Sequence, residues 1–157
     1  MVRLTVRGCL AGVALALLLP GCNPAERTTR VALLPFTLVA AGAGDSAWAD
    51  SLCRTLAERL AQTGRVTVRL REPAMALLAD SVPAERLARQ LLADWILRGS
   101  LLHAGDSVRL TLTLSNGNSG DPPWVRTFTG PVRPIEPLLE RLRDSLLAQI
   151  SIAATRQ

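Results

Sequence analysis

The stretch SVRLTLTLS, residues 107–115, has the clearest periodicity in the chain. Apolar side chains alternate along it with polar ones, with Val108, Leu110, Leu112 and Leu114 on one face and Arg109, Thr111 and Thr113 on the other. Successive side chains of a β-strand point to opposite faces of its sheet, so an alternation of period two predicts a half-buried strand. We therefore expect a sheet that is packed on one face and open to water on the other.

One further strand is predicted on each side of this one in the sequence. DWILRGSLL at 94–102 precedes it across a tight HAGD turn at 103–106. WVRTF at 124–128 follows it after NGNSGDPP at 116–123, a loop rich in turn-forming residues. Short connections join antiparallel neighbours, so the three strands are expected to form a meander.

The first part of the chain predicts two more strands. RVALLPF at 30–36 is an apolar run that proline should end at Pro35, and VAAGAG at 39–44 is expected to be a flexible loop. RVTVRL at 65–70 alternates in the same way as residues 107–115. Its apolar face is expected to hold Val66, Val68 and Leu70.

A first amphipathic helix is predicted from Asp45 or Ser46, either of which offers a capping oxygen, to about Gln62. Gly64 is expected to stop it. Its apolar stripe is spaced by four and comprises Trp48, Leu52, Leu56 and Leu60, with Cys53 and Ala57 beside it. A charged ladder on another face comprises Asp50, Arg54 and Glu58.

Two later segments also have helical periodicity. PAERLARQLL at 83–92 begins with a proline suited to a first helical turn, and Leu87 and Leu91 share a face. The last helix is expected from about Pro137. Its apolar face contains Ile135, Leu139, Leu142, Leu146 and Ile150.

The order of predicted elements is β-α-β-α-β-β-β-α, and it forms one domain over residues 31–153. Parallel strands joined by helices and a terminal meander together give a mixed sheet. Right-handed crossovers around the first three strands are expected to place the helices on one face of that sheet. The predicted fold class is therefore an α/β two-layer sandwich.

The beginning of the chain has the pattern of an export signal. Arg3 and Arg7 precede an uncharged apolar run of about a dozen residues, which is short for a permanent membrane anchor. The run ends in LLLPGC, which resembles the bacterial lipobox, with Pro20 in place of the usual alanine or serine. We expect residues 1–21 to be a lipoprotein signal peptide, Cys22 to carry lipid, and residues 22–30 to include a tether.

Two alternatives to lipidation remain open, namely ordinary signal cleavage near Gly21 and an uncleaved amino-terminal helix. If lipid is attached, several acyl chains give stable anchoring. Asn23 is not the aspartate associated with inner-membrane retention, which favours the outer membrane. The expected location is the bacterial cell envelope, with the domain facing the periplasm.

Cysteine content and charge restrict the function further. With Cys9 removed and Cys22 lipidated, Cys53 is the only thiol left, and its place in a helical stripe indicates a buried side chain. The net charge of +5 falls to +3 without Arg3 and Arg7. A small net charge and few aromatic residues argue against nucleic acid as a partner.

Several stretches together resemble the TolB amino-terminal-like domain. The similarity lies in VALLPF at 31–36, the helix at 48–63, VTVRLRE at 66–72 and the hairpin at 91–114. Residues Trp95–Ser100 match the motif of the third strand. The hairpin motif is matched by Gly105 and Asp106, with Ala104 replacing its first aspartate. The resemblance covers nearly the whole domain.

This resemblance implies a fold more strongly than an activity. Similar domains occur in TolB, in flagellar and curli-type outer-membrane lipoproteins, and in lipoproteins that activate peptidoglycan synthases. Their roles are binding and assembly. The resemblance therefore implies a domain that is not an enzyme and has an envelope protein or peptidoglycan as its partner.

The sequence contains few residue patterns that are typical of a catalytic site. Arg65, Arg69 and Arg71 alternate along one strand and form a candidate interaction face for phosphates or carboxylates. The AGAGD loop lacks the full phosphate-binding pattern, and His103 has no second histidine with which to hold a metal. We found no nucleophile motif, and we predict no catalytic, cofactor or metal residues.

Trp95 and Trp124 are expected to be packing residues of the sheet and not a platform for a ligand. The leading hypothesis is a non-catalytic, lipid-anchored binding or assembly domain. The first alternative is a subunit that self-associates into an outer-membrane ring or channel collar, and an envelope hydrolase is a remote one. No cofactor is expected.

Overall fold

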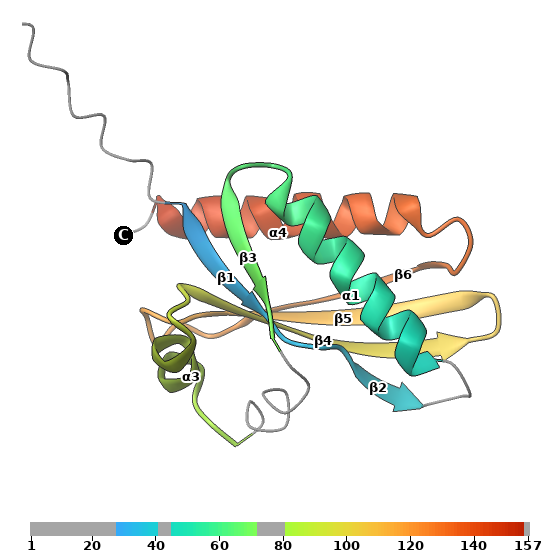
Figure 1. Ribbon diagram of the computed structural model, residues 1–157, viewed down its shortest axis with the longest axis horizontal. Coiled ribbons are helices and arrows are strands. Elements are labelled where there is room, and N and C mark those ends of the chain that lie inside the picture. Colours follow the sequence, from blue (N-terminus) through green and yellow to red (C-terminus); the bar gives the residue numbers. More distant parts are fainter. Residues whose placement is uncertain (1–27, 41–44, 72–80, 156–157) are drawn as a thin grey trace, which may run out of the picture.

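A computed structural model describes residues 28–40, 45–71 and 81–155 (Figure 1). The elements, in chain order, are β1 (Thr29–Leu33), β2 (Thr37–Ala40), α1 (Asp45–Ala61), β3 (Val66–Leu70), α3 (Ala84–Leu91), β4 (Trp95–Ala104), β5 (Ser107–Asn116), β6 (Trp124–Pro131) and α4 (Glu136–Ala154). The expected signal peptide and Cys22 lie outside the described residues.

The strands form one mixed sheet in the order β3-β1-β4-β5-β6. β1 pairs in parallel with β3 and β4, whereas β5 pairs in the antiparallel sense with β4 and β6. The predicted α/β sandwich, its mixed sheet and its carboxyl-terminal meander are therefore confirmed.

The alternation in residues 107–115 is confirmed in β5. Its apolar residues are at most 1% exposed, namely Val108, Leu110, Leu112 and Leu114. Arg109 on the other face is exposed, and the Thr111 hydroxyl shares a 2.9 Å hydrogen bond with that of Thr127 on β6. The two-residue turn between β4 and β5 contains Gly105 at φ +59°, a conformation that glycine tolerates.

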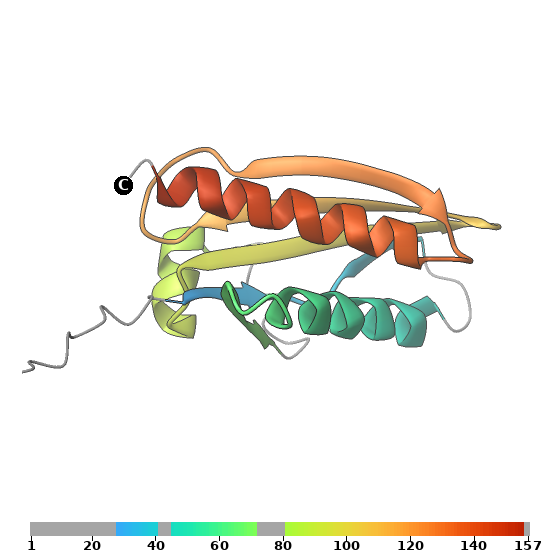
Figure 2. The ribbon, with the colours of Figure 1, turned by 90° about the horizontal axis from the view of Figure 1, so that it is seen from above.

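Helices α1 and α4 cover the face of the sheet that holds these apolar residues (Figure 2). The stripe predicted for α1 is confirmed by the burial of Leu52, Cys53, Leu56 and Leu60. In α4 the buried residues are Leu138, Leu139, Leu142, Leu146, Leu147 and Ile150. Gly64, at φ +68°, follows the end of α1, as expected for a residue that stops a helix.

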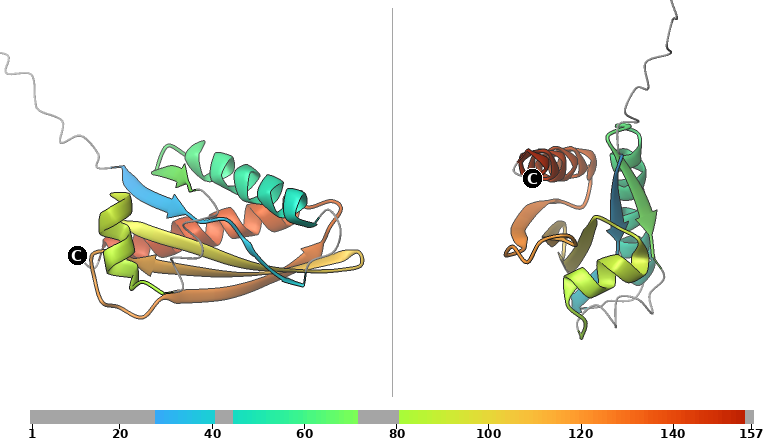
Figure 3. Two further views of the ribbon diagram at one scale, coloured as in Figure 1. Left: turned by 60° about the horizontal axis from the view of Figure 1, so that its bottom comes forward. Right: turned by 90° about the vertical axis from the view of Figure 1, so that its left-hand side faces the viewer.

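The expectation that all the helices share one face is wrong for α3. Its Leu87, Ala88 and Leu91 form a separate core with residues of the opposite face, Ala32, Leu34 and Ile96 (Figure 3, right). In the order β3-β1-β4, the connection from β1 to β3 and the connection from β3 to β4 run in opposite directions. Right-handed crossovers in opposite directions place their helices on opposite faces.

The segment after Pro35 is a second correction. Residues 37–40, two of which were expected to belong to a loop, form β2 and pair in parallel with β4. The backbone N–H of Leu34 donates to the carbonyl of Leu97 at 2.9 Å, so β1 and β2 follow the same neighbouring strand. Proline interrupts the pairing without turning the chain away from β4.

The burial predicted for residues 65–70 is only partly correct. Val66 is buried, Val68 is half-buried and Leu70 is 43% exposed. β3 lies at the end of the strand order, and Leu70 faces a small hollow beside Asp50 and Arg54 of the charged ladder on α1. The apolar stripe of α1 therefore does not cover the end of this strand.

Candidate binding site at the open end of the sheet

The three arginines of the predicted interaction face are not equivalent in the structure. Arg71 donates a 2.9 Å hydrogen bond to the carbonyl of Leu91 at the end of α3. Arg65 donates to the hydroxyl of Ser151 near the end of α4, and Arg69 is exposed. Two of the three guanidinium groups therefore connect elements of the domain, and the interaction face stays a prediction.

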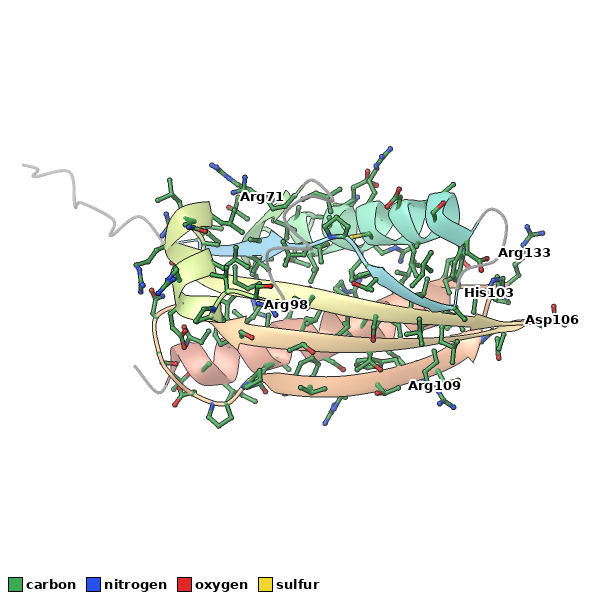
Figure 4. All side chains as sticks on the ribbon, turned by 90° about the horizontal axis from the view of Figure 1, so that it is seen from below. Arg71, Arg98, His103, Asp106, Arg109 and Arg133 are labelled. Atoms are coloured by element: carbon green, nitrogen blue, oxygen red, sulfur yellow. The ribbon has the colours of Figure 1, made fainter. Side chains whose placement is uncertain are left out.

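His103 contacts two residues that are far from it in the sequence, Asp45 and Trp48. Its Nδ1 lies 2.9 Å from Oδ1 of Asp45, and the Trp48 ring stacks on it with 5.3 Å between ring centroids. The hydrogen bond to Asp45 raises the pKa of His103. Among the described residues, no group of three or more His, Cys, Asp and Glu side chains is placed to hold a metal ion. The cluster joins the start of α1 to the β4–β5 hairpin, whose His103 and Asp106 are labelled in Figure 4.

Cys53 is 1% exposed, and its Sγ lies 3.7 Å from the carbonyl oxygen of Leu34. Burial raises the pKa of its thiol from 9.0 to about 12. The thiolate is the reactive form of cysteine, so both burial and proton affinity oppose chemistry at this side chain.

We expect the folded domain to protect Cys53 from a thiol reagent. At about pH 8, the raised pKa leaves very little of this thiol as the reactive thiolate, and burial restricts access to it as well. A fragment that begins at Ala25 has Cys53 as its one cysteine, so its alkylation can be followed by mass. Labelling should be slow in buffer and fast in concentrated guanidinium chloride. Equal rates in the two solvents would show that this thiol is accessible in the folded state.

A hollow of about 550 Å³ lies at one end of the sheet, and the described residues that line it do not include the three arginines of the predicted interaction face. We call it the tryptophan hollow. It lies beside the start of β4, the end of β5 and the start of β6, and the carboxyl-terminal part of α4 closes one side. Its lining comprises Trp95, Leu114, Asn116, Ser119, Asp121, Pro122, Trp124, Gln149 and Ala153.

Strand register explains why the two tryptophans share this hollow. Leu114 of β5 is opposite Leu97 on β4 and Trp124 on β6, while Trp95 is two residues before Leu97. Residues in register, or two apart on one strand, lie on the same face of a sheet. Both indoles therefore lie on the face that α4 covers, 29 residues apart in the sequence. They line a cavity, which the sequence analysis did not predict.

The loop between β5 and β6 forms the rim of the hollow and is held by several hydrogen bonds. The Asn118 N–H donates to the side-chain oxygen of Asn116 at 2.9 Å, and the Ser119 hydroxyl donates to Asp121 at 2.7 Å. The Gly117 N–H donates to the carbonyl of Asp94 at 2.8 Å. A Cβ at Gly117 would lie 2.2 Å from that of Ala88, so only glycine fits beside α3. The rim is thus fixed against the domain.

Asp94 connects this rim to the start of β1. Its carboxylate accepts hydrogen bonds from the backbone N–H of Arg30 at 2.8 Å and from its guanidinium at 3.0 Å. The pKa of Asp94 is lowered, because the hydrogen bonds from Arg30 outweigh the opposing effect of burial. The same residue therefore secures both β1 and the loop at residue 117.

A second groove, of about 590 Å³, lies on the opposite face between the start of α3 and the same loop. Arg98 lines it together with Glu85 and Asp121. The Nε atoms of Arg98 and Arg71 are buried without a hydrogen-bond partner among the described residues. Figure 4 shows Arg98 beside α3. Because positive and negative side chains both line this groove, its charge does not indicate whether a ligand would be an anion or a cation.

The fold and this end of the sheet together define an α/β sandwich domain with a hollow lined by two tryptophans. No family model matches the chain, and no curated protein matches it in sequence. The chain is similar to the crystal structure of lipoprotein GNA1162 from Neisseria meningitidis, with a TM-score of 0.52 and 15% identity. That match covers 78% of this chain and 96% of the other.

Two other solved structures have lower scores. The PelC dodecamer from Paraburkholderia phytofirmans has a TM-score of 0.46 and 21% identity, over 80% of this chain and 85% of the other. The LpoB C-terminal domain from Escherichia coli has a TM-score of 0.46 and 20% identity, over 66% and 82%. The likeness to GNA1162 shows the fold, and the resemblance to the TolB amino-terminal-like domain stays a prediction.

Proposed function

We propose that the chain is a non-catalytic lipoprotein domain of the cell envelope, anchored through Cys22, that binds another envelope component at the tryptophan hollow. The observation that carries the proposal is that hollow, with its aromatic wall and its rim of polar side chains fixed to the domain. Small-molecule sites are commonly concave and apolar, with a few well-placed polar groups.

The position of the hollow supports the anchoring part of the proposal. Trp95, at the start of β4, is in register with Val31 near the start of β1, and the two strands are parallel. The hollow and the beginning of the domain therefore lie at the same end of the sheet. Cys22 is six positions before Thr28, a distance of at most about 22 Å when the chain is extended. A lipid at Cys22 would hold this end of the domain close to a membrane surface.

The likeness in fold also supports the proposal. GNA1162, which shares the fold, is itself described as a lipoprotein. In the described part of the chain, no helix is long and apolar enough to cross a bilayer. His103 forms a hydrogen bond with Asp45 at the end of β4 that is far from the tryptophan hollow. No histidine is among the described residues that line the hollow. Outer-membrane attachment with the domain in the periplasm is the location we propose.

Replacing Cys22 by serine tests the anchor. The wild-type protein is expected to fractionate with membranes and to have a mass that includes the acyl chains, because the thioether forms at this sulfur. Cys22→Ser should leave unprocessed precursor or soluble protein. Cys53→Ser is the matched control, since Cys53 is buried in the core and should leave lipidation intact. If Cys22→Ser retains its membrane fraction and its mass, the anchor is not at this residue.

A further inference from the structure

The polar groups around the tryptophan hollow include several that the domain itself does not pair. Within the described residues, neither the indole N–H of Trp95 or Trp124 nor the half-buried Gln149 amide has a protein hydrogen-bond partner. None of these groups is among the side-chain atoms that are fully buried without a partner in the described part of the chain, so each is open to water or to a ligand. Their hydrogen-bonding capacity is therefore available to a molecule from outside the domain.

The aromatic wall of the hollow has one ring held in place. The guanidinium of Arg126 lies 5.7 Å from the centre of the Trp124 ring, at cation–π distance. Arg126 is two residues after Trp124 on β6, the last strand in the order of the sheet. On the neighbouring strand, Leu114 of β5 is in register with Trp124. A fixed indole loses little conformational entropy when a ligand stacks on it.

The chemistry of the lining distinguishes between classes of ligand. An acyl chain would cover the Gln149 amide and the two indole N–H groups without giving them partners, which is costly for polar groups. An anion would meet the Asp121 carboxylate. Among the described residues that line the hollow, Asp121 has the one carboxylate, which already accepts a hydrogen bond from Ser119 and would be a poor site for a metal ion. A neutral ligand with an apolar face and many donors and acceptors fits best.

We propose that the tryptophan hollow binds a sugar unit of a neutral, N-acetylated oligosaccharide. The C–H face of a pyranose ring would pack on the indoles, which have an apolar face and a polar N–H. The ring hydroxyls and the acetamido group both donate and accept hydrogen bonds, as the amides of Asn116 and Gln149 do. The volume of about 550 Å³ lies within the range of small-molecule sites. This inference rests on the proposed function and names the ligand class of the same site.

Titration of the full-length protein in detergent with a chitooligosaccharide tests the proposal. We expect a saturable change in tryptophan fluorescence and a matching heat signal by calorimetry. Trp124→Ala should weaken the affinity by about tenfold or more, because it removes the stacking surface. Trp48→Phe is the matched control. Trp48 stacks on His103, which lies about 26 Å along β4 from Trp95, so its loss should leave the affinity unchanged.

Two additional measurements keep the test decisive if Trp124→Ala does not fold. Gln149 is a half-buried residue of α4, and Gln149→Ala should also weaken binding, whereas Thr127→Ala on the outer face of β6 should not. A glucose oligomer of equal length, without acetamido groups, should bind more weakly. The proposal is overturned if the wild type shows no saturable signal, or if Gln149→Ala and Thr127→Ala bind equally well. Neither result affects the anchor, which the fractionation of Cys22→Ser tests separately.

Discussion

Leu112→Ala is expected to lower the free energy of unfolding by about 2–5 kcal/mol, the usual cost of truncating a buried leucine. Leu112 is fully buried in the core that α1 and α4 form with the sheet, at the centre of β5. Its removal leaves a cavity in a layer of leucines, because the two strands and the helices around it are fixed by other contacts. The substitution should not change the secondary structure.

Thr111→Ala, one residue away, is the matched control. Thr111 is on the opposite face, and its loss removes one surface hydrogen bond to Thr127, worth about 1 kcal/mol or less. Denaturant midpoints of the two variants in the fragment that begins at Ala25 measure the difference. A strand that slips by one residue exchanges its faces, so greater destabilisation by Thr111→Ala would show that the register is wrong.

Gly99→Ala is expected to destabilise the domain by about 1–3 kcal/mol through overpacking. A Cβ at Gly99 would lie 2.4 Å from Cδ1 and 2.6 Å from Cε1 of Phe36, distances that the ring cannot accept without moving. Phe36 is 7% exposed, so its ring has little space into which it can shift. The glycine is thus required by a side chain on the segment that follows β1.

A double-mutant cycle identifies the cause of this loss. Phe36→Ala removes both clashing ring atoms, so Gly99→Ala should cost less in that background than in the wild type. Gly120→Ala is the control, since a Cβ there meets nothing within 4 Å, and it should change stability by no more than about 0.5 kcal/mol. If the cost of Gly99→Ala is the same with and without Phe36, the ring is not the obstacle.

The candidate site was harder to anticipate than the elements that carry it. Trp95 and Trp124 were expected to be packing residues, and the structure places both beside one cavity. Asp45 and His103 are 58 residues apart, and nothing in the sequence near either one indicates the other. The sequence of α4 contains no pattern that marks Gln149 as a site residue. Such residues are brought together by strand register and by the path of α4, and sequence periodicity contains neither.

The sequence by itself determined the local structure of the strongly periodic segments. The faces of β5, the stripe of α1 and the apolar side of α4 follow from which side chains are apolar and from the repeat of 2.0 or 3.6 residues. These properties depend on neighbours only a few residues away, so a single segment contains all the information that they need.

Only the tertiary structure decided the side of the sheet on which α3 lies, the pairing of β2 and the existence of the hollow. Strand order is set by the burial of all the apolar faces together, and the order β3-β1-β4 reverses the direction of the second crossover. That reversal moves α3 to the opposite face, where Ala88 confines Gly117 and so positions the loop at the rim of the hollow. The physical reason is that these contacts join residues far apart in the chain, whose proximity exists only once the sheet has formed.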